Sequence, residues 1–118
     1  MREERGQVAG DVVIYEPYTL WGSIGGNVKV IERGKFYLRG AVYGDISVEY
    51  GGRMHIFGRC TGSLTVHRGA KVIHSGVIGG DVTNNGGRLY VDHGATINGK
   101  IRALKGETKL APPPRRVQ

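Results

Sequence analysis

The segment Gly94–Lys100, which reads GATINGK, has the glycine and lysine spacing of a phosphate-binding P-loop. In a functional P-loop the next residue is Ser or Thr, whose hydroxyl binds magnesium, and a helix follows whose N-terminus faces the phosphates. Ile101 stands at that position, and no helical pattern follows it. The sequence therefore predicts no nucleotide site at this segment, and it predicts no cofactor elsewhere.

Histidine and cysteine are the other residue types that could bind a metal or transfer protons. Cys60 is the only cysteine, which excludes an intramolecular disulfide and a cysteine-based zinc site. The four histidines, which fall at different positions of the 18-residue repeat described below, are His55, His67, His74 and His93. We expect His74 near an inward position and the other three in solvent. The sequence predicts no catalytic residue and no metal site.

Three basic residues, Lys35, Arg53 and Lys71, are 18 residues apart and are expected to form a column on one outer face. Like charges stacked at the strand spacing of ~4.8 Å repel one another unless an anionic partner lies across them. The simpler interpretation is a solvated face that prevents sideways aggregation. The alternative is a binding stripe for acidic lipid, polysaccharide or nucleic acid. Such a stripe would make the protein an anion-binding adaptor, which we consider as a third function beside the two given below.

The formal net charge is +7, and residues 102–118 hold five basic residues and one acidic residue. More than half of the excess positive charge lies in this short segment. We therefore expect no site for specific nucleic-acid recognition in the rest of the chain. The basic residues from Lys105 to Arg116 could contact a membrane surface or another anionic polymer. No apolar stretch is long enough to span a bilayer, and the first residues, MREERGQ, do not resemble a signal peptide. A cytoplasmic protein is expected, with membrane association left open.

An internal repeat of 18 residues underlies these positions. Glycine makes up 21 of the 118 residues, and two glycine series keep the 18-residue interval. The first series is Gly22, Gly40, Gly58, Gly76 and Gly94, and the second is Gly26, Gly44, Gly62 and Gly80, with Asn98 and Gly99 at its next place. Glycines at a fixed interval predict corners at which the chain bends in every coil.

Aliphatic residues follow the same interval and predict the core. The expected inward columns are Val28, Ile46, Leu64 and Val82; Val12, Val30, Val48 and Val66; Phe36, Met54 and Val72; and Ile24, Val42, Cys60 and Ile78, with Ile97 one place late. Within a coil the inward residues are six apart, which favours three short strands, and the helical spacing of three and four is absent. We therefore predict an all-β, single-stranded parallel β-helix (a β-solenoid) of about five coils, with Cys60 buried as a small apolar residue.

The repeat also sets the expected boundaries. Residues 1–7 are predicted to form a short charged tail, residues 8–101 the β-helix domain, and residues 102–118 a basic, proline-containing flexible tail. In the last coil the middle strand shifts by one place, to Leu89 and Val91.

The segments GSLTVHRGAKVIHSGVIGGDV, from Gly62, and GRLYVDHGATINGKI, from Gly87, both contain an L-x-V-x-x-GA-x-V/I unit followed by a glycine corner. In this pattern, residues 8–101 resemble the bactofilins, bacterial polymer-forming cytoskeletal proteins. The resemblance implies a right-handed β-helix that joins end to end into filaments without nucleotide, whereas the residues themselves leave the handedness open. Met1–Gln7 departs from the family, because many bactofilins have an apolar N-terminal peptide that touches the membrane.

We therefore interpret the chain as a structural scaffold that is not an enzyme and that polymerises with itself. Every solenoid has two open ends, and no strong cap follows Ile101. The residues expected to join subunits in the terminal coils are Val12, Leu20, Leu89, Val91, Ile97 and Ile101. The principal alternative is a trimeric enzyme with a left-handed β-helix, of the hexapeptide-repeat acyltransferase or carbonic-anhydrase-like class. Those enzymes place a histidine between subunits, a role for which His67 or His93 would be the candidate.

Overall fold

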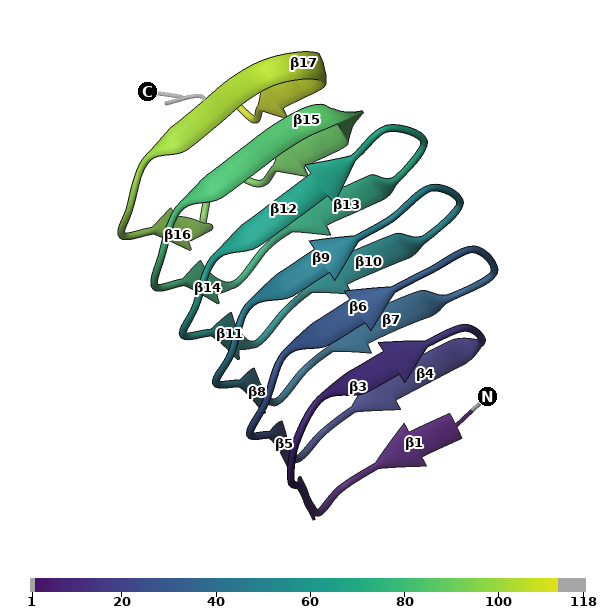
Figure 1. Ribbon diagram of the computed structural model, residues 1–118. Coiled ribbons are helices and arrows are strands. Elements are labelled where there is room, and N and C mark those ends of the chain that lie inside the picture. The colour runs from purple at the N-terminus through teal and green to yellow at the C-terminus, as the bar shows by residue number, and fades with distance from the viewer. Residues whose placement is uncertain (1, 113–118) are drawn as a thin grey trace, which may run out of the picture.

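Each coil of the chain contributes three short strands, and each strand stacks on the equivalent strands of the neighbouring coils (Figure 1). The computed structural model describes residues 2–112, and it contains no helix within them. The strands form a parallel β-solenoid of about six turns with about 18 residues per turn. The predicted fold class and coil length are therefore confirmed, with about one turn more than expected.

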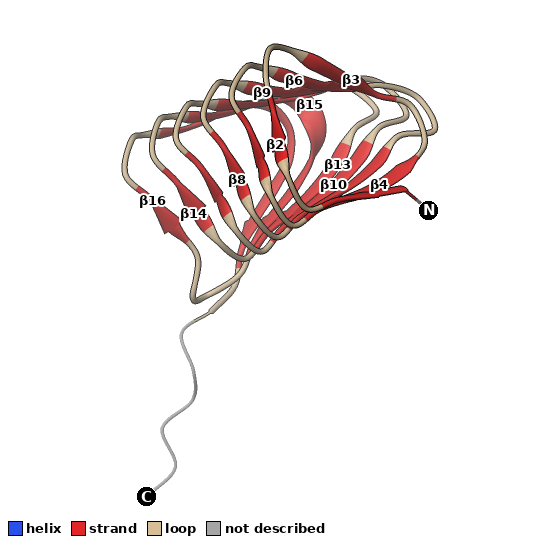
Figure 2. Cartoon of the chain, turned by 90° about the horizontal axis from the view of Figure 1, so that it is seen from below, coloured by secondary structure: helices blue, strands red, loops and turns tan. Residues whose placement is uncertain are grey.

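The solenoid has three walls (Figure 2). The first wall contains β3 (Val12–Ile14), β6 (Val28–Val30), β9 (Ile46–Val48) and β12 (Leu64–His67). The second wall contains β1 (Arg2–Glu4), β4 (Pro17–Leu20), β7 (Lys35–Leu38), β10 (Arg53–Ile56) and β13 (Lys71–His74). The third wall contains β2 (Gln7–Val8), β5 (Ser23–Ile24), β8 (Ala41–Val42), β11 (Arg59–Cys60), β14 (Val77–Ile78) and β16 (Thr96–Ile97). Two longer strands, β15 (Val82–Val91) and β17 (Ile101–Leu110), continue from the first wall into the second.

Paired strands are parallel throughout residues 2–112, so inward side chains of successive coils lie directly over one another. The register confirms the predicted columns Phe36–Met54–Val72 and Ile24–Val42–Cys60–Ile78, and it places Ile97 at the end of the second one. The columns fill the interior with almost fully buried aliphatic side chains. Each such side chain contributes about 1.5–3 kcal/mol by leaving water, so the core is the main source of stability.

The predicted position of Val12 is wrong by one column. Val12 pairs with Val28, and Ile14 takes the place over Val30 at which Val12 was expected. The cause is the turn between β3 and β4, in which two residues separate Ile14 from Pro17, whereas four residues separate Val30 from Lys35. The first coil is therefore two residues shorter than 18.

Four of the five glycines of the first predicted series lie at corners where successive coils approach most closely. Gly94 is the exception, because Ala95 faces Gly76 in the last coil and nothing lies within 4 Å of a Cβ atom on Gly94. A Cβ atom on Gly40 would overlap the carbonyl oxygen of Gly22 in the preceding coil. That carbonyl accepts a hydrogen bond of 3.0 Å from the backbone N–H of Ala41, so it cannot move aside without breaking the ladder. Gly22, Gly58 and Gly76 have the same environment. These corners admit only glycine because the stacked backbones leave no space for a side chain.

The strands extend past both expected boundaries of the solenoid. Before residue 8, β1 pairs with β4 and β2 pairs with β5. After residue 101, β17 pairs with β15 through Leu110. The side chains of β17 are nearly all exposed, because no further coil covers them, and this is why the segment lacks the buried aliphatic pattern of the middle coils. Of the segment expected to be a tail, residues 113–118 lie outside the described residues.

Candidate self-association and anion-facing surfaces

The two ends of the solenoid carry strands that have a neighbour on one side only. At the N-terminal end these strands are β1, β2 and β3, and at the C-terminal end they are β16 and β17. A strand edge of this kind exposes backbone N–H and C=O groups that can pair with another chain. Both ends therefore have the backbone geometry that would extend the stack into a second molecule.

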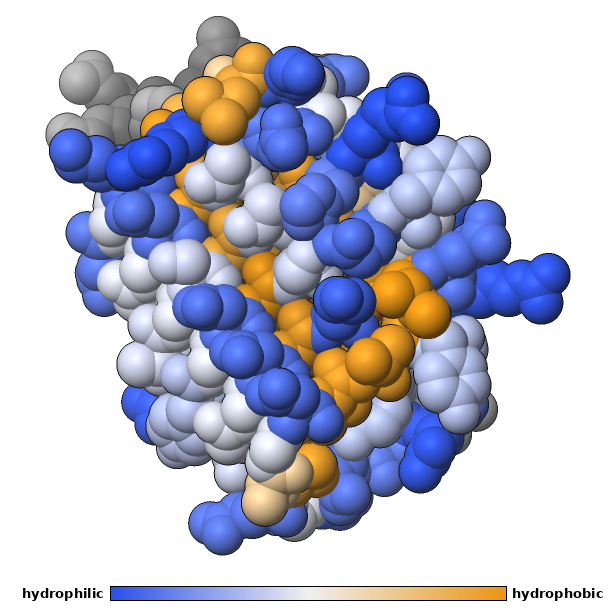
Figure 3. Space-filling view, in the orientation of Figure 1, coloured by the Kyte–Doolittle hydropathy of each residue, from blue (hydrophilic) through white to orange (hydrophobic). Residues whose placement is uncertain are grey.

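The C-terminal end is the more apolar of the two. Ile101 lies in register with buried Val82 but is itself 40% exposed, because nothing covers it. Leu104 and Leu110, also in β17, are 64% and 61% exposed. Apolar side chains gather over β17 at this end (Figure 3). This end thus exposes apolar side chains beside a free strand edge, and both would be covered by another subunit.

The N-terminal end mixes apolar and charged side chains. Val8 and Val12 are partly buried against the core, whereas Arg2 and Glu4 stand in register over Tyr18 and Leu20. The inward columns that contain Tyr18 and Leu20 therefore end in charged residues on this side. The two ends offer different chemistry to a partner.

The six residues predicted for self-association divide into two groups. Val12, Ile97 and Ile101 lie in the outermost strands β3, β16 and β17. Leu20, Leu89 and Val91 lie one coil further in, where β1 or β17 covers them, and their exposed fractions are 0%, 2% and 7%. The second group belongs to the core of the chain itself, because the strands β1 and β17 were not anticipated.

The three predicted basic residues stack in register on the second wall. Arg53 lies beside Lys35 on one side and Lys71 on the other. Arg88 continues the column in β15, in register with Lys71. Arg88 was not predicted because it lies 17 residues after Lys71, although the one-place shift at Leu89 applies to it as well. The column thus contains four exposed cations.

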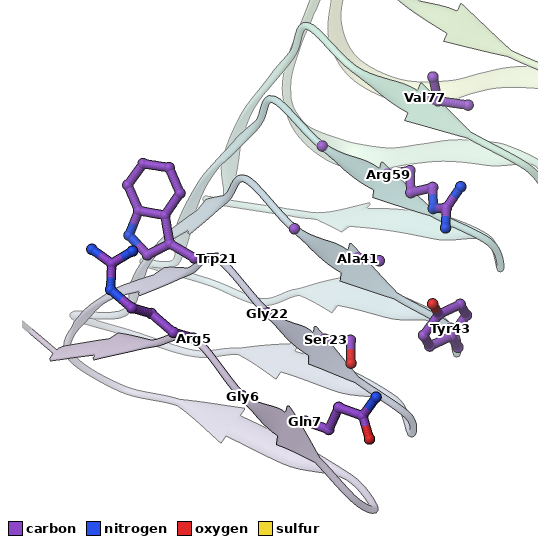
Figure 4. A pocket seen from close by; sticks show the side chains of 12 residues that line it. Arg5, Gly6, Gln7, Trp21, Gly22, Ser23, Ala41, Tyr43, Arg59 and Val77 are labelled. Carbon is purple, nitrogen blue, oxygen red and sulfur yellow. The ribbon is translucent and has the colours of Figure 1, made fainter.

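A corner ladder of arginine and aromatic side chains was also not predicted, and two of its members, Arg5 and Trp21, line a shallow groove of about 610 Å³ beside the third wall (Figure 4). The guanidinium groups of Arg5 and Arg39 each lie 5.2 Å from the centroid of the Trp21 ring, and Arg39 lies 4.2 Å from that of Phe57. The Trp21 indole N–H donates a 3.0 Å hydrogen bond to the Glu3 carboxylate. Trp21, Arg39 and Phe57 share the repeat position before a corner glycine, which is the signal that could have revealed the ladder.

Two clusters combine histidine, serine and a carboxylate. In the first, Nε2 of His67 lies 3.1 Å from the Ser47 hydroxyl and 3.0 Å from the Glu49 carboxylate. The Ser47 hydroxyl donates to Glu49, so the proton of Ser47 already has an acceptor. A serine nucleophile needs the histidine as the acceptor of its proton, with the carboxylate on the other ring nitrogen. The first cluster therefore lacks the hydrogen-bond order of a hydrolase triad.

The second cluster is arranged like the first, so it too lacks the hydrogen-bond order of a hydrolase triad. Nε2 of His55 lies 3.2 Å from the Ser75 hydroxyl, which donates to Asp92. Burial lowers the pKa of His55, an effect that the nearby Asp92 carboxylate partly opposes. The His55 ring also stacks on Phe57 at 3.8 Å between centroids. His93, by contrast, is exposed and stands apart from both clusters.

Two further ionisable groups are buried in the core. Burial raises the pKa of the Cys60 thiol to about 11, so this inward side chain is not a reactive thiolate at neutral pH. Burial also lowers the pKa of His74, which is 0% exposed. The inward positions predicted for Cys60 and His74 are confirmed. Within residues 2–112 no group of three His, Cys, Asp or Glu side chains is placed to hold a metal ion.

Asn84 is a buried polar residue that the sequence analysis did not identify. It stands in register over Val66, at the end of an aliphatic column. Its carboxamide oxygen accepts hydrogen bonds from the N–H groups of Gly86 and Gly87, at 3.2 and 2.9 Å. Its amide nitrogen donates to the Glu107 carbonyl and the Thr108 hydroxyl of β17, at 3.0 and 2.9 Å. Asn84 therefore holds the bend of β15 and fastens β17 to it.

Comparison with known proteins gives a match over almost the whole solenoid. The family model of the bactofilins, described as polymer-forming cytoskeletal proteins, matches residues 3–102. No curated protein and no solved structure matched the chain significantly. In the part of the chain that the structure describes, no helix is long and apolar enough to cross a membrane.

Proposed function

The chain belongs to the bactofilin family, whose members are polymer-forming cytoskeletal proteins, and we propose that it is a cytoplasmic scaffold that polymerises end to end without nucleotide. The proposal rests on the family and on one observation, the uncapped C-terminal end. Solenoids that stay monomeric end in polar caps, because the last coil would otherwise expose its core and its strand edge. In this chain the last coil ends with exposed Ile101, Leu104 and Leu110.

The subunit contact would extend the stack in the way that coils extend it within the chain. Backbone groups on the free edge of β17 would pair with a strand of the next subunit, and Ile101 and Ile97 would continue their columns across the joint. At the N-terminal end, Val8 and Val12 are the apolar side chains that a partner would cover. We therefore replace Leu20, Leu89 and Val91 with Val8 and Leu110 in the proposed interface.

Independence from nucleotide is proposed from the geometry of Gly94–Lys100. Thr96 and Ile97 of this segment form β16, and β17 begins at Ile101, so the segment consists of one short strand and the corner that leads into the next strand. Nucleotide phosphates are usually held where a glycine-rich loop opens a helix, whose N-terminal N–H groups face them. Gly94–Lys100 is instead followed by a strand, which has no such cluster of N–H groups at its start. Assembly should accordingly proceed equally in the presence and absence of ATP or GTP.

Sedimentation and negative-stain microscopy of the purified chain test the proposal. The wild-type chain should form polydisperse filaments. Ile101→Glu should raise the concentration needed for assembly by at least ~100-fold, because an unpaired carboxylate buried at the joint costs several kcal/mol. Val77→Glu is the matched control, since Val77 is also 40% exposed but lies in β14, which has a neighbouring strand on both sides. It should assemble normally.

Two results would contradict the proposal. If folded Ile101→Glu protein formed filaments of normal length, the C-terminal end would not be a subunit contact. If the wild-type chain were a sharp trimer or a monomer at every concentration, end-to-end polymerisation would be wrong. A trimer would instead favour the enzyme class considered from the sequence.

A further inference from the structure

Four exposed basic side chains follow one another on the outer face of the second wall. Lys35 of β7 is in register with Arg53 of β10, Arg53 with Lys71 of β13, and Lys71 with Arg88 of β15. Neighbouring strands are ~4.8 Å apart, so the four charges extend over about 14 Å in single file along the solenoid axis. We call these four residues the basic row.

The charges of the basic row are not neutralised by the described part of the chain. The ion pairs within residues 2–112 are His67–Glu49, Arg102–Asp81 and Lys109–Glu107, none of which includes the row. Glu107 lies in register with Arg88 at the end of the row, but its carboxylate is paired with Lys109 at 3.1 Å. Like charges on directly opposed residues destabilise a sheet, so the row costs stability that an anionic partner would recover.

Hollows on both sides leave the row accessible along its length. On one side, a hollow of about 260 Å³ is lined by Lys35, Tyr37, Arg53, Met54, His55, Lys71 and Ile73. On the other side, a hollow of about 410 Å³ is lined by Gly51, Gly52, Arg53, Gly69, Ala70, Lys71, Gly86, Gly87 and Arg88. Most of the turn residues that line this second hollow are glycine, and the Tyr50 ring lies against one of them, Gly69. A chain-like ligand can therefore lie along the row and reach each cation.

We propose that the basic row binds a linear phosphate polymer that lies along the solenoid axis. Lysine binds phosphate as a point charge and arginine binds it through two parallel N–H groups, so the row presents both kinds of phosphate contact. A flat lipid surface fits less well, because the cations form one file between neutral hollows and would meet few headgroups.

The aromatic neighbours of the row favour recognition through the phosphates. The Lys35 ammonium lies 5.5 Å from the centroid of the Tyr37 ring, and the His55 ring stacks on Phe57. Each of these two rings therefore already has a partner on one face, which disfavours the base stacking that proteins use to bind single-stranded nucleic acid. Inorganic polyphosphate and the backbone of a single strand share the recognised chemistry, and the first should bind more tightly because its charges are denser.

Binding of fluorescent inorganic polyphosphate, of a deoxythymidine oligonucleotide and of anionic phospholipid vesicles tests the proposal. The test variant is Arg53→Glu/Lys71→Glu, and the control is Lys29→Glu/Arg59→Glu, which changes the net charge equally at two exposed residues of the other walls. At 50 mM salt the test variant should bind polyphosphate at least ~10-fold more weakly than the control. The slope of log affinity against log salt should fall from about 3 towards about 1.5, as expected for two of four phosphate contacts. If the charge reversal disturbs folding, the neutral variant Arg53→Gln/Lys71→Gln replaces it. This variant should lose affinity for polyphosphate in the same direction but by a smaller factor.

The three probes separate the possible ligands. Loss of polyphosphate binding alone identifies inorganic polyphosphate, and loss of both polymers identifies the phosphate backbone in general; both results support the proposal. Equal binding by the test variant and the control overturns it, since binding would then depend on the net positive charge of the protein and not on the basic row. Binding of vesicles through the row without binding of either polymer also overturns it, and identifies a lipid surface instead. Because the sedimentation of each variant is measured separately, a failure to form filaments cannot be mistaken for a failure to bind polyphosphate.

Discussion

The Nε2 atom of His74 lies 2.9 Å from the carbonyl oxygen of Thr96 in the next coil. The backbone N–H of Gly76 points at Nδ1 of the same ring, at 3.4 Å, so Nδ1 accepts and Nε2 carries the proton. His74 is therefore neutral in a column that otherwise contains Ile56 below it and Val91 above it. A second proton on this ring would displace the Gly76 contact and place a charge in an aliphatic core.

This geometry predicts that acid destabilises the fold. Burial lowers the pKa of His74 below its ordinary value of 6.5, and that of His55 in the same direction. The unfolded chain then binds more protons than the folded chain, so the free energy of unfolding falls as the pH drops below 6.5 and continues to fall towards the lowered pKa. Urea unfolding between pH 7.5 and 5 should show this decrease.

The variant His74→Leu separates the contribution of this ring. It should be about 1–2 kcal/mol less stable at pH 7.5, because the Thr96 carbonyl loses its partner, yet its stability should depend less on pH. A pH dependence identical to that of the wild type would show that His74 does not cause the acid effect.

A ladder of polar side chains along one corner gives a second prediction. Asn27 accepts a 2.8 Å hydrogen bond from the backbone N–H of Asp45, and Asp11 accepts one of 2.8 Å from that of Asn27. Asn27→Asp keeps the acceptor but places three carboxylates at the same corner of neighbouring coils, ~4.8 Å apart. It should cost about 1 kcal/mol at low salt and neutral pH, and much less in 1 M salt. Thermal unfolding at two salt concentrations measures this, and Ser63→Asn, a neutral change in the same ladder, should have no comparable effect.

Backbone strain at Arg33 gives a third prediction. Arg33 has a φ of 72°, and Gly51 and Gly69, at the same repeat position, have φ values of 77° and 79°. Arg33→Gly should therefore stabilise the fold by a few tenths of a kcal/mol up to about 1 kcal/mol, after the greater freedom of glycine in the unfolded chain is subtracted. The melting temperature measures this gain. Gly69→Ala should do the opposite, because its Cβ would overlap the Tyr50 ring. A lower melting temperature for Arg33→Gly would contradict the argument.

The sequence predicted the middle coils well because every coil repeats the same constraints. Val48 is inward for the same reason as Val30 and Val66, and each occurrence of the pattern supports the others. The prediction failed where a coil changes length. A shortened turn moved Val12 to another column, and a 17-residue step concealed Arg88.

The ends were harder to predict because the features there occur only once. Asn84 interrupts an aliphatic column with a polar group whose partners lie up to 24 residues away. The strand β17 lacks a buried pattern because no coil covers it. Periodicity in a sequence reveals only features that repeat, so a residue that terminates the repeat gives no periodic signal.

The hydrogen bonds of Asn84 give the last prediction, which connects the fold to assembly. Asn84→Val completes the aliphatic column of Val66, but it leaves the N–H groups of Gly86 and Gly87 and the Glu107 carbonyl without their side-chain partner. Unpaired buried polar groups cost about 1–3 kcal/mol each, partly offset by the apolar gain. Because coils contribute to stability mainly through their neighbours, the loss should be confined to β15 and β17.

Hydrogen exchange of the backbone amides measures where that loss falls. In Asn84→Val the amides of Ile101–Leu110 should exchange at least ~10-fold faster, whereas those of β9 and β10 should stay protected. The same variant should assemble poorly, because β17 supplies the free edge and the exposed Ile101 of the proposed joint. Asn85→Val, at the exposed neighbouring position, is the control and should leave both exchange and assembly unchanged. If Asn84→Val released β17 and filaments still formed normally, β17 would not be part of the subunit contact, and the joint would have to be sought at the N-terminal strands.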